Sequence, residues 1–268
     1  MEIIKINDVN LAYGIAGEGE PILLIHGGVL ADSFAGMLIQ VTLKNFQTIH
    51  YHRRGHGLSG DFNGRTDYKQ QAADALALLN HVGINRVHLV GHSFGGGIAL
   101  QLAIDAPEIV QSLVLLEGLM PLPDNFVPPP SFGPLPMESI NSQSIEQLAD
   151  IFMTRLLGQN WENDLSEFIE NPGAQVIRGI KTTMFQERDM FFGRVTVKAY
   201  EKITQPILWV SGDQPLIPVA APMAGLMQQM IPQTEFKVIN GIGHSLQIAR
   251  PKDVAEIIAD YLRKFPIR

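Results

Sequence analysis

The residues best suited to chemistry lie in a short segment in the first half of the chain. Residues 91–95 read Gly-His-Ser-Phe-Gly, so that one serine stands between two glycines. An apolar strand pattern at 87–90 precedes this segment and a helical pattern at 96–106 follows it. The glycines permit a tight turn from strand to helix, and the helix N-terminus behind Ser93 favours developing negative charge. This context predicts that Ser93 is a nucleophile rather than a helix-capping serine.

A base for this nucleophile is expected near the end of the chain. The sequence contains eight histidines, so most of them must do something else. His244 follows Gly243 and precedes a helix predicted over residues 253–264, which places it on a loop at the rim of a sheet. His26 and His92 lie inside other motifs, where we expect structural roles. We therefore predict that His244 is the general base.

A third motif could hold the negative charge that such a reaction creates. Residues 26–28 read His-Gly-Gly and directly follow a continuous apolar run at 21–25. Attack by a serine on a carbonyl gives a tetrahedral oxyanion, which backbone N–H groups stabilise. We expect the amide of Phe94 to supply one donor and that of Gly28 the other, with Val29 as the alternative to Gly28.

The elements that must position these residues alternate between strand and helix patterns. Segments 2–6 and 10–15 indicate two short antiparallel strands. Further strands are predicted at residues 21–25, 46–51, 86–90, 112–116, 206–211 and 234–239, and helices at 67–82, 94–106 and 253–264. Strands that are apolar on both faces and alternate with helices are typical of a mostly parallel sheet covered by helices.

One long segment, residues 121–200, interrupts this alternation because it contains no clear buried strand. It opens with several prolines, including the run at 128–130, and helical patterns follow at 145–157, 161–169 and 175–185. We predict that residues 1–120 and 201–268 form the core. Residues 121–200 are then a helical lid, or cap, inserted between two core strands.

These motifs together resemble those of the α/β-hydrolase superfamily over nearly the whole chain. The matching segments are Leu-Leu-Ile-His-Gly-Gly at 23–28, Arg-Gly-His-Gly-Leu-Ser at 54–59, the serine motif at 91–95 and Gly-Ile-Gly-His at 241–244. The resemblance implies a mostly parallel, eight-stranded sheet flanked by helices, with an inserted helical lid. One departure is His52, which stands where many relatives carry an aspartate.

The carboxylate partner of His244 has two candidates. Many relatives carry it in a Gly-x-x-Asp-x-x-x-Pro pattern after a late strand, but residues 212–218 are one residue short of that pattern and set Asp213 beside the expected place. Some relatives instead carry a glutamate after an earlier strand, where Glu117 follows residues 112–116. A carboxylate at the end of an apolar strand is costly unless it is paired, and we therefore favour Glu117 over Asp213.

Composition narrows the class of protein and its partners. The 268 residues are 46% hydrophobic and carry a formal net charge of −7, which argues against nucleic-acid binding. We interpret the one short basic run, residues 52–54, as a solvated loop. The absence of cysteine excludes disulfides and thiolate catalysis. The start of the chain does not resemble a signal peptide and no apolar stretch is long enough to span a membrane, so we expect a cytoplasmic protein.

The predicted reaction is acyl transfer to water through an acyl-enzyme on Ser93, with no metal and no cofactor. We expect a small-molecule substrate, a small or medium apolar ester or lactone, and a possible homodimer. Hydrolysis of a carbon–carbon bond in a vinylogous diketone is the alternative, because it uses the same residues under a similar lid. A third reading is a non-hydrolytic lyase or cyclase of this fold, or a small-molecule receptor.

Overall fold

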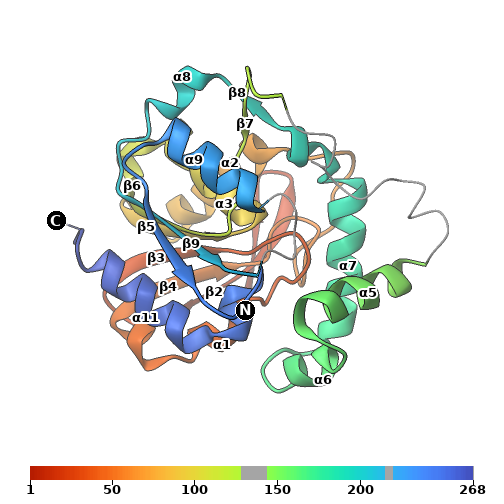
Figure 1. Cartoon of the computed structure of the whole chain (residues 1–268). Helices are drawn as coiled ribbons and strands as arrows, with labels where there is room; N and C mark the ends of the chain where they lie inside the picture. The colour runs from red at the N-terminus through yellow and green to blue at the C-terminus, as the bar shows by residue number, and fades with distance from the viewer. Residues whose placement is uncertain (128–143, 215–219, 268) are drawn as a thin grey trace.

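The computed structural model describes residues 1–127, 144–214 and 220–267, and its centre is a twisted eight-stranded sheet (Figure 1). The strand order is β1-β2-β4-β3-β5-β6-β9-β10. The strands are β1 (Glu2–Ile6), β2 (Val9–Ala16), β3 (Glu20–Ile25), β4 (Phe46–Tyr51), β5 (Val87–His92), β6 (Val110–Leu116), β9 (Ile207–Gly212) and β10 (Glu235–Ile239). Strand β2 pairs antiparallel with β1 and β4, and the other pairs of neighbouring strands are parallel. The predicted fold class, a mostly parallel sheet of the α/β-hydrolase type, is therefore confirmed.

Two apolar layers cover the sheet, because successive residues of a strand point to opposite faces. Leu23 and Ile25 pack into one layer, with helices α2 (Tyr68–His81), α3 (Phe94–Asp105) and α9 (Ala220–Met230). Ile22 and Leu24 pack into the other, with α1 (Ala35–Leu38), α10 (Leu246–Ala249) and α11 (Pro251–Leu262). This burial on both faces explains why the strands read as continuous apolar runs.

The order of the strands marks one edge of the sheet as the place for a site. Strand β3 pairs with β4 on one side and with β5 on the other, so the strand order reverses at β3. The connections after β3 and β5 therefore diverge at the carboxyl ends of these two strands, which is the place where ligands bind in open α/β sheets. The motifs at 26–28 and 91–95 both lie there.

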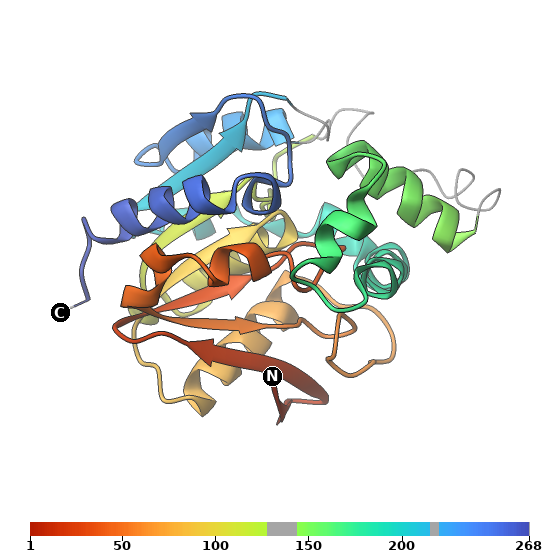
Figure 2. The same ribbon diagram turned by 90° about the horizontal axis from the view of Figure 1, so that it is seen from below.

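Helices α5 (Ile145–Leu157), α6 (Trp161–Ser166) and α7 (Pro172–Phe185) lie together beyond one end of the sheet in both views (Figures 1 and 2). We call these three helices the insert. Ser144 and Gln147 cap the start of α5 reciprocally. The three helices share an apolar cluster with Leu30 of the loop after β3. The division into a core and a lid stays a prediction, and the proline run at 128–130 lies outside the described residues.

Some elements escaped the sequence analysis. Residues 121–200 contain two short paired strands, β7 (Leu122–Pro123) and β8 (Arg194–Val195). The unpredicted helices are α1, α9, α10 and α8 (Val197–Tyr200), together with the 3-10 helices η1 (Val41–Asn45), η2 (Pro107–Ile109) and η3 (Arg188–Phe192). No helix within the described ranges is long and apolar enough to cross a membrane.

The turn after β5 yields a test of how tightly the elements pack. A Cβ on Gly95 would lie 2.0 Å from the carbonyl oxygen of Ile25, so Gly95→Ala must displace β3 or α3. We expect a loss of about 3 kcal/mol in the free energy of unfolding, measured by urea denaturation. Gly225→Ala is the control, because its Cβ meets no atom within 4 Å and the α9 backbone gains roughly 0.5–1 kcal/mol from alanine. Equal stability of the two variants would contradict this account.

Candidate active site

Ser93 occupies a strained turn between β5 and α3. Its backbone angles, φ 53° and ψ −120°, lie where non-glycine residues are rarely found. Backbone hydrogen bonds on both sides hold this conformation, because the Ser93 amide donates to Leu116 O at 3.1 Å and the Ser93 carbonyl accepts from Gly96 N at 2.9 Å. The half-buried serine is thus fixed at the tip of the turn, at the carboxyl end of β5.

A buried carboxylate lies against the imidazole of His244. Glu117, directly after β6, is 2% exposed, and His244 is 5% exposed. The Nδ1–H of His244 donates to Glu117 Oε2 at 2.8 Å, and Gly212 N donates to Glu117 Oε1 at 2.9 Å. Each carboxylate oxygen therefore has a partner, and this contact sets the tautomer that leaves His244 Nε2 without a proton.

The other acid candidate makes a different contact. Asp213 is exposed, and its Oδ1 accepts a hydrogen bond from Gly241 N at 2.7 Å. It thus braces the loop that carries His244, while the imidazole itself contacts Glu117. The rest of the acid pattern weighed above, residues 215–218, lies outside the described residues.

His92 joins the serine turn to the His244 loop. Its Nε2–H donates to the His244 carbonyl at 2.9 Å, and the two rings are 4.7 Å apart between centroids. A Cβ on Gly27 would meet both the His92 ring and Ser93 Cβ, so the same ring also borders the serine. Burial, and next the nearby charge of His244, lowers the pKa of His92 to about 3, so the ring stays neutral.

His92 thus contacts His244 and directly precedes Ser93 in the chain, so it links the Glu117–His244 pair to the serine turn. Among the described residues, the Ser93 hydroxyl does not form a hydrogen bond with His244. Catalytic hydrogen bonds often tighten only when substrate is bound.

The predicted oxyanion donors flank the serine. Phe94 N is the first amide of α3 and has no helical acceptor, as at any helix start. Gly28 is buried, and a Cβ there would lie 2.8 Å from the Phe94 ring, so the two residues touch. Val29 follows, and its carbonyl packs against Gly179 of α7. In the described ranges the amides of Gly28 and Val29 donate to no protein acceptor.

An ion pair that the sequence analysis did not identify lies behind this loop. Arg53 is fully buried, not solvated as expected for the basic run at 52–54, and its guanidinium binds the carboxylate of Glu187, which follows α7. Burial alone would raise the pKa of Glu187, but the charges of Arg53 and His56 outweigh it and lower the pKa to about 2. Gln71 Nε2 also donates to Glu187, at 2.9 Å.

His52, which departs from the family pattern, contacts Asp32 on the loop after β3. Leu58 N donates to His52 Nδ1 at 2.8 Å, so the proton is on Nε2, which donates to Asp32 Oδ1 at 2.9 Å. Burial raises the pKa of Asp32, but hydrogen bonds from His52 and from Gln175 of α7 bring its pKa below the ordinary value. The loop after β3 is therefore anchored to both the core and the insert.

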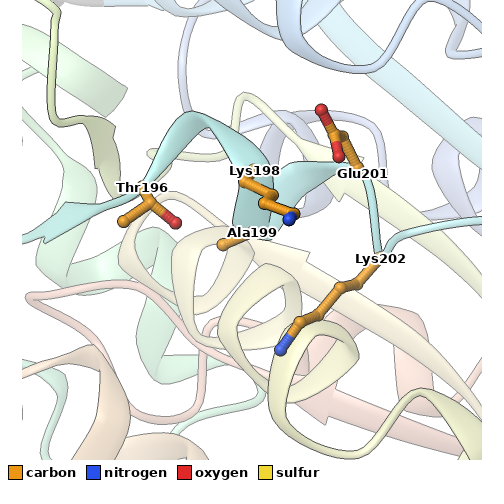
Figure 3. Close-up of a pocket in the computed structure, with 5 residues that line it drawn as sticks. All are labelled: Thr196, Lys198, Ala199, Glu201 and Lys202. Atoms are coloured by element: carbon orange, nitrogen blue, oxygen red, sulfur yellow. The ribbon is translucent and has the colours of Figure 1, made fainter.

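Two surface hollows lie outside this cluster. One, about 380 Å³, is lined beside α8 by Thr196, Lys198, Ala199, Glu201 and Lys202 (Figure 3). The other, about 420 Å³, lies between the insert and α10 and includes Trp161, Phe168 and Ile248. Neither is lined by Ser93 or His244. In the described part of the chain, no group of three or more His, Asp or Glu side chains could hold a metal ion.

Comparison with known proteins defines the class. Residues 20–251 match the family described as "alpha/beta hydrolase fold", and the chain belongs to this family. It is similar to a non-heme haloperoxidase of Rhodococcus erythropolis, with 27% identity over 86% of this chain and 87% of that protein. RutD of Azorhizobium caulinodans, a candidate carbamate hydrolase, is 36% identical, but over only 41% of this chain and 42% of its own length.

Solved structures share the fold over the full chain. A thermophilic esterase from Thermogutta terrifontis superposes with a TM-score of 0.77 and 22% identity, covering 98% of this chain and 99% of the esterase. At this identity the likeness shows the fold alone. Fold and family together identify a hydrolase-type protein.

The neutral state of His92 predicts a loss of stability in acid. The unfolded chain takes up a proton near the ordinary pKa of 6.5, whereas folded His92 does so only near 3, so its contribution is present above 6.5 and is lost as the pH falls toward 3. His92→Gln keeps a donor for the His244 carbonyl and cannot titrate. Between about pH 7.5 and pH 5, we expect the variant to lose about 2 kcal/mol less than the wild type in urea unfolding. Identical losses would refute the burial argument.

Proposed function

We propose that this protein is a serine hydrolase in which Ser93, His244 and Glu117 form the catalytic triad. The observation that carries the proposal is the buried Glu117–His244 contact of 2.8 Å beside a serine held at positive φ. A carboxylate on Nδ1 orients the imidazole and stabilises the imidazolium, and Nε2 is left to accept a proton. Buried carboxylate–imidazole pairs of this kind occur often at catalytic sites, where the imidazole activates a nucleophile.

The mechanism follows from these positions. His244 Nε2 removes the proton of Ser93 as Oγ attacks the substrate carbonyl, and the amides of Phe94 and Gly28 receive the oxyanion. His244 then protonates the leaving group, and the acyl group stays on Ser93. A water molecule, deprotonated by His244, releases the acid and restores the serine.

The substrate proposed is a small or medium apolar ester or lactone. Phe94 and Phe191 of η3 meet edge to face, with ring centroids 4.7 Å apart, beside the oxyanion loop. Aromatic walls with a few polar groups are typical of sites for apolar ligands. The similarity in fold to the Thermogutta esterase is consistent with this class.

Replacement of the nucleophile is the first test. Ser93→Ala should lower kcat for p-nitrophenyl butyrate on the order of 10⁴-fold or more, because no oxygen remains to form the acyl-enzyme. The wild type should also be labelled by a fluorophosphonate and the variant should not. Circular dichroism checks that the fold is intact. Wild-type turnover in Ser93→Ala would rule out the proposal.

The two acid candidates can be separated by isosteric changes. Glu117→Gln should lower kcat by about 10⁴-fold, because an amide on Nδ1 no longer favours the required tautomer and imidazolium. Asp213→Asn, the matched control, should change kcat by no more than about twofold, since the side chain is exposed and its hydrogen-bond partner among the described residues is Gly241 N. If the Asp213 change alone abolishes turnover, the acid is assigned wrongly.

A further inference from the structure

The peptide unit between Gly27 and Gly28 is held from one side by two donors. Arg53 Nη2 donates to Gly27 O at 2.8 Å, and His26 Nδ1 donates to the same oxygen at 2.7 Å. Arg53 N in turn donates to His26 Nε2 at 2.9 Å, which fixes the tautomer with the proton on Nδ1. Burial also lowers the pKa of His26 well below its ordinary value, so the ring keeps one donor and one acceptor.

Planarity of the peptide bond carries this restraint to the Gly28 amide. The described residues contain no cis peptide bond, so the Gly27 carbonyl and the Gly28 N–H point in opposite directions. Two donors on the carbonyl therefore set the direction of the N–H, on the side away from Arg53. A cation on the carbonyl also polarises the peptide and makes its N–H a better donor to an anion.

Glu187, two residues after the end of α7, holds the cation in place. Both carboxylate oxygens of Glu187 contact the Arg53 guanidinium, and neither side chain is exposed. Thr183, on the last turn of α7, contacts Glu187 Oε2 at 3.2 Å and donates to Gly28 O. Hydrogen bonds thus connect Glu187 to Arg53, and Arg53 to the carbonyl of the Gly27–Gly28 peptide.

We propose that Arg53 and Glu187 are positioning residues that aim the Gly28 N–H at the oxyanion. This inference rests on the proposed function. Arg53 contacts the carbonyl of this peptide, and Glu187 contacts Arg53. Both residues therefore act on the reaction through the Gly28 amide. Because the oxyanion exists only in the transition state and the intermediate, the pair should affect kcat and leave KM nearly unchanged.

Kinetics of two variants test the proposal. Arg53→Lys cannot bind Glu187 and Gly27 O in the same forked geometry, and Glu187→Gln removes the charge that holds Arg53. We expect each to lower kcat for p-nitrophenyl butyrate about 10- to 100-fold, part of the ~10²–10³-fold that a lost oxyanion donor costs, with KM within about threefold. Affinity for a trifluoromethyl ketone, which mimics the tetrahedral state, should fall by the same factor as kcat/KM. If the ketone affinity stays unchanged, the proposal is overturned.

Arg178 provides the matched control for loss of a contact between the insert and the core. It also lies on α7 and binds core-loop oxygens, those of Gly57 and Ser59 and of the Asp61 side chain, but it does not contact the peptide at 27–28. Arg178→Gln should therefore leave kcat within about twofold. A fall in kcat equal to that of Arg53→Lys would mean that only docking of the insert matters, and would overturn the proposal.

Thr183→Val distinguishes the two candidate donors. Thr183 binds Gly28 O, whose peptide carries the Val29 N–H, whereas Arg53 controls the Gly28 N–H. A larger loss of kcat in Thr183→Val than in Arg53→Lys would make Val29 the donor and overturn the assignment.

An NMR readout separates this inference from the proposed function. The Gly28 amide resonance should shift in Arg53→Lys and Glu187→Gln and stay in place in Arg178→Gln, whether or not the protein hydrolyses an ester. Absence of Ser93-dependent turnover would defeat the proposed function alone, and an unmoved Gly28 resonance would defeat the positioning role. If the single variants do not fold, Arg53→Met with Glu187→Leu replaces the buried pair by apolar side chains and serves in the same measurements.

Discussion

A charge buried at the end of an apolar strand must find a partner, and the site of this protein is arranged around one such charge. Glu117 satisfies its two oxygens with Gly212 N and the His244 ring, and so ties together the ends of β6 and β9 and the loop after β10. Strand β6 also pairs in parallel with β5, whose last residue precedes Ser93. The cost of desolvating one carboxylate thus fixes the relative positions of segments that are far apart in the sequence.

Most of the sheet could be predicted from the sequence because its parallel strands are buried on both faces and read as apolar runs. The turn at Ser93 could be predicted because a tight strand-to-helix connection needs glycines, as Gly95 shows. The carboxylate in contact with His244 was favoured by a burial argument, where loop spacing alone was ambiguous. Helix α9 was missed because Pro222 and Gly225 are poor helix formers, and α10 because four residues give almost no periodicity.

The Arg53–Glu187 pair shows where local patterns fail. Its members are 134 residues apart, and Arg53 lies in a short basic run that looks like an ordinary exposed loop. Only the tertiary fold brings a carboxylate to it. The neighbouring His52 is a similar case: the family pattern marks it as a departure, but the sequence does not show that an acid on the loop after β3, Asp32, pairs with it.

Beside its apolar contacts and its side-chain hydrogen bonds, helix α7 makes a set of hydrogen bonds to carbonyl oxygens of the main chain. Thr182 and Thr183 donate to the carbonyls of Gly55 and Gly28, and Arg178 to that of Gly57. Every amino acid offers the same carbonyl, so side chains in the core loops can diverge without loss of these bonds, provided the backbone keeps its path. For these bonds, only the donor side chains on α7 must be kept. Co-variation between aligned columns would accordingly miss these three hydrogen bonds, although they fix the position of α7 on the loops after β3 and β4.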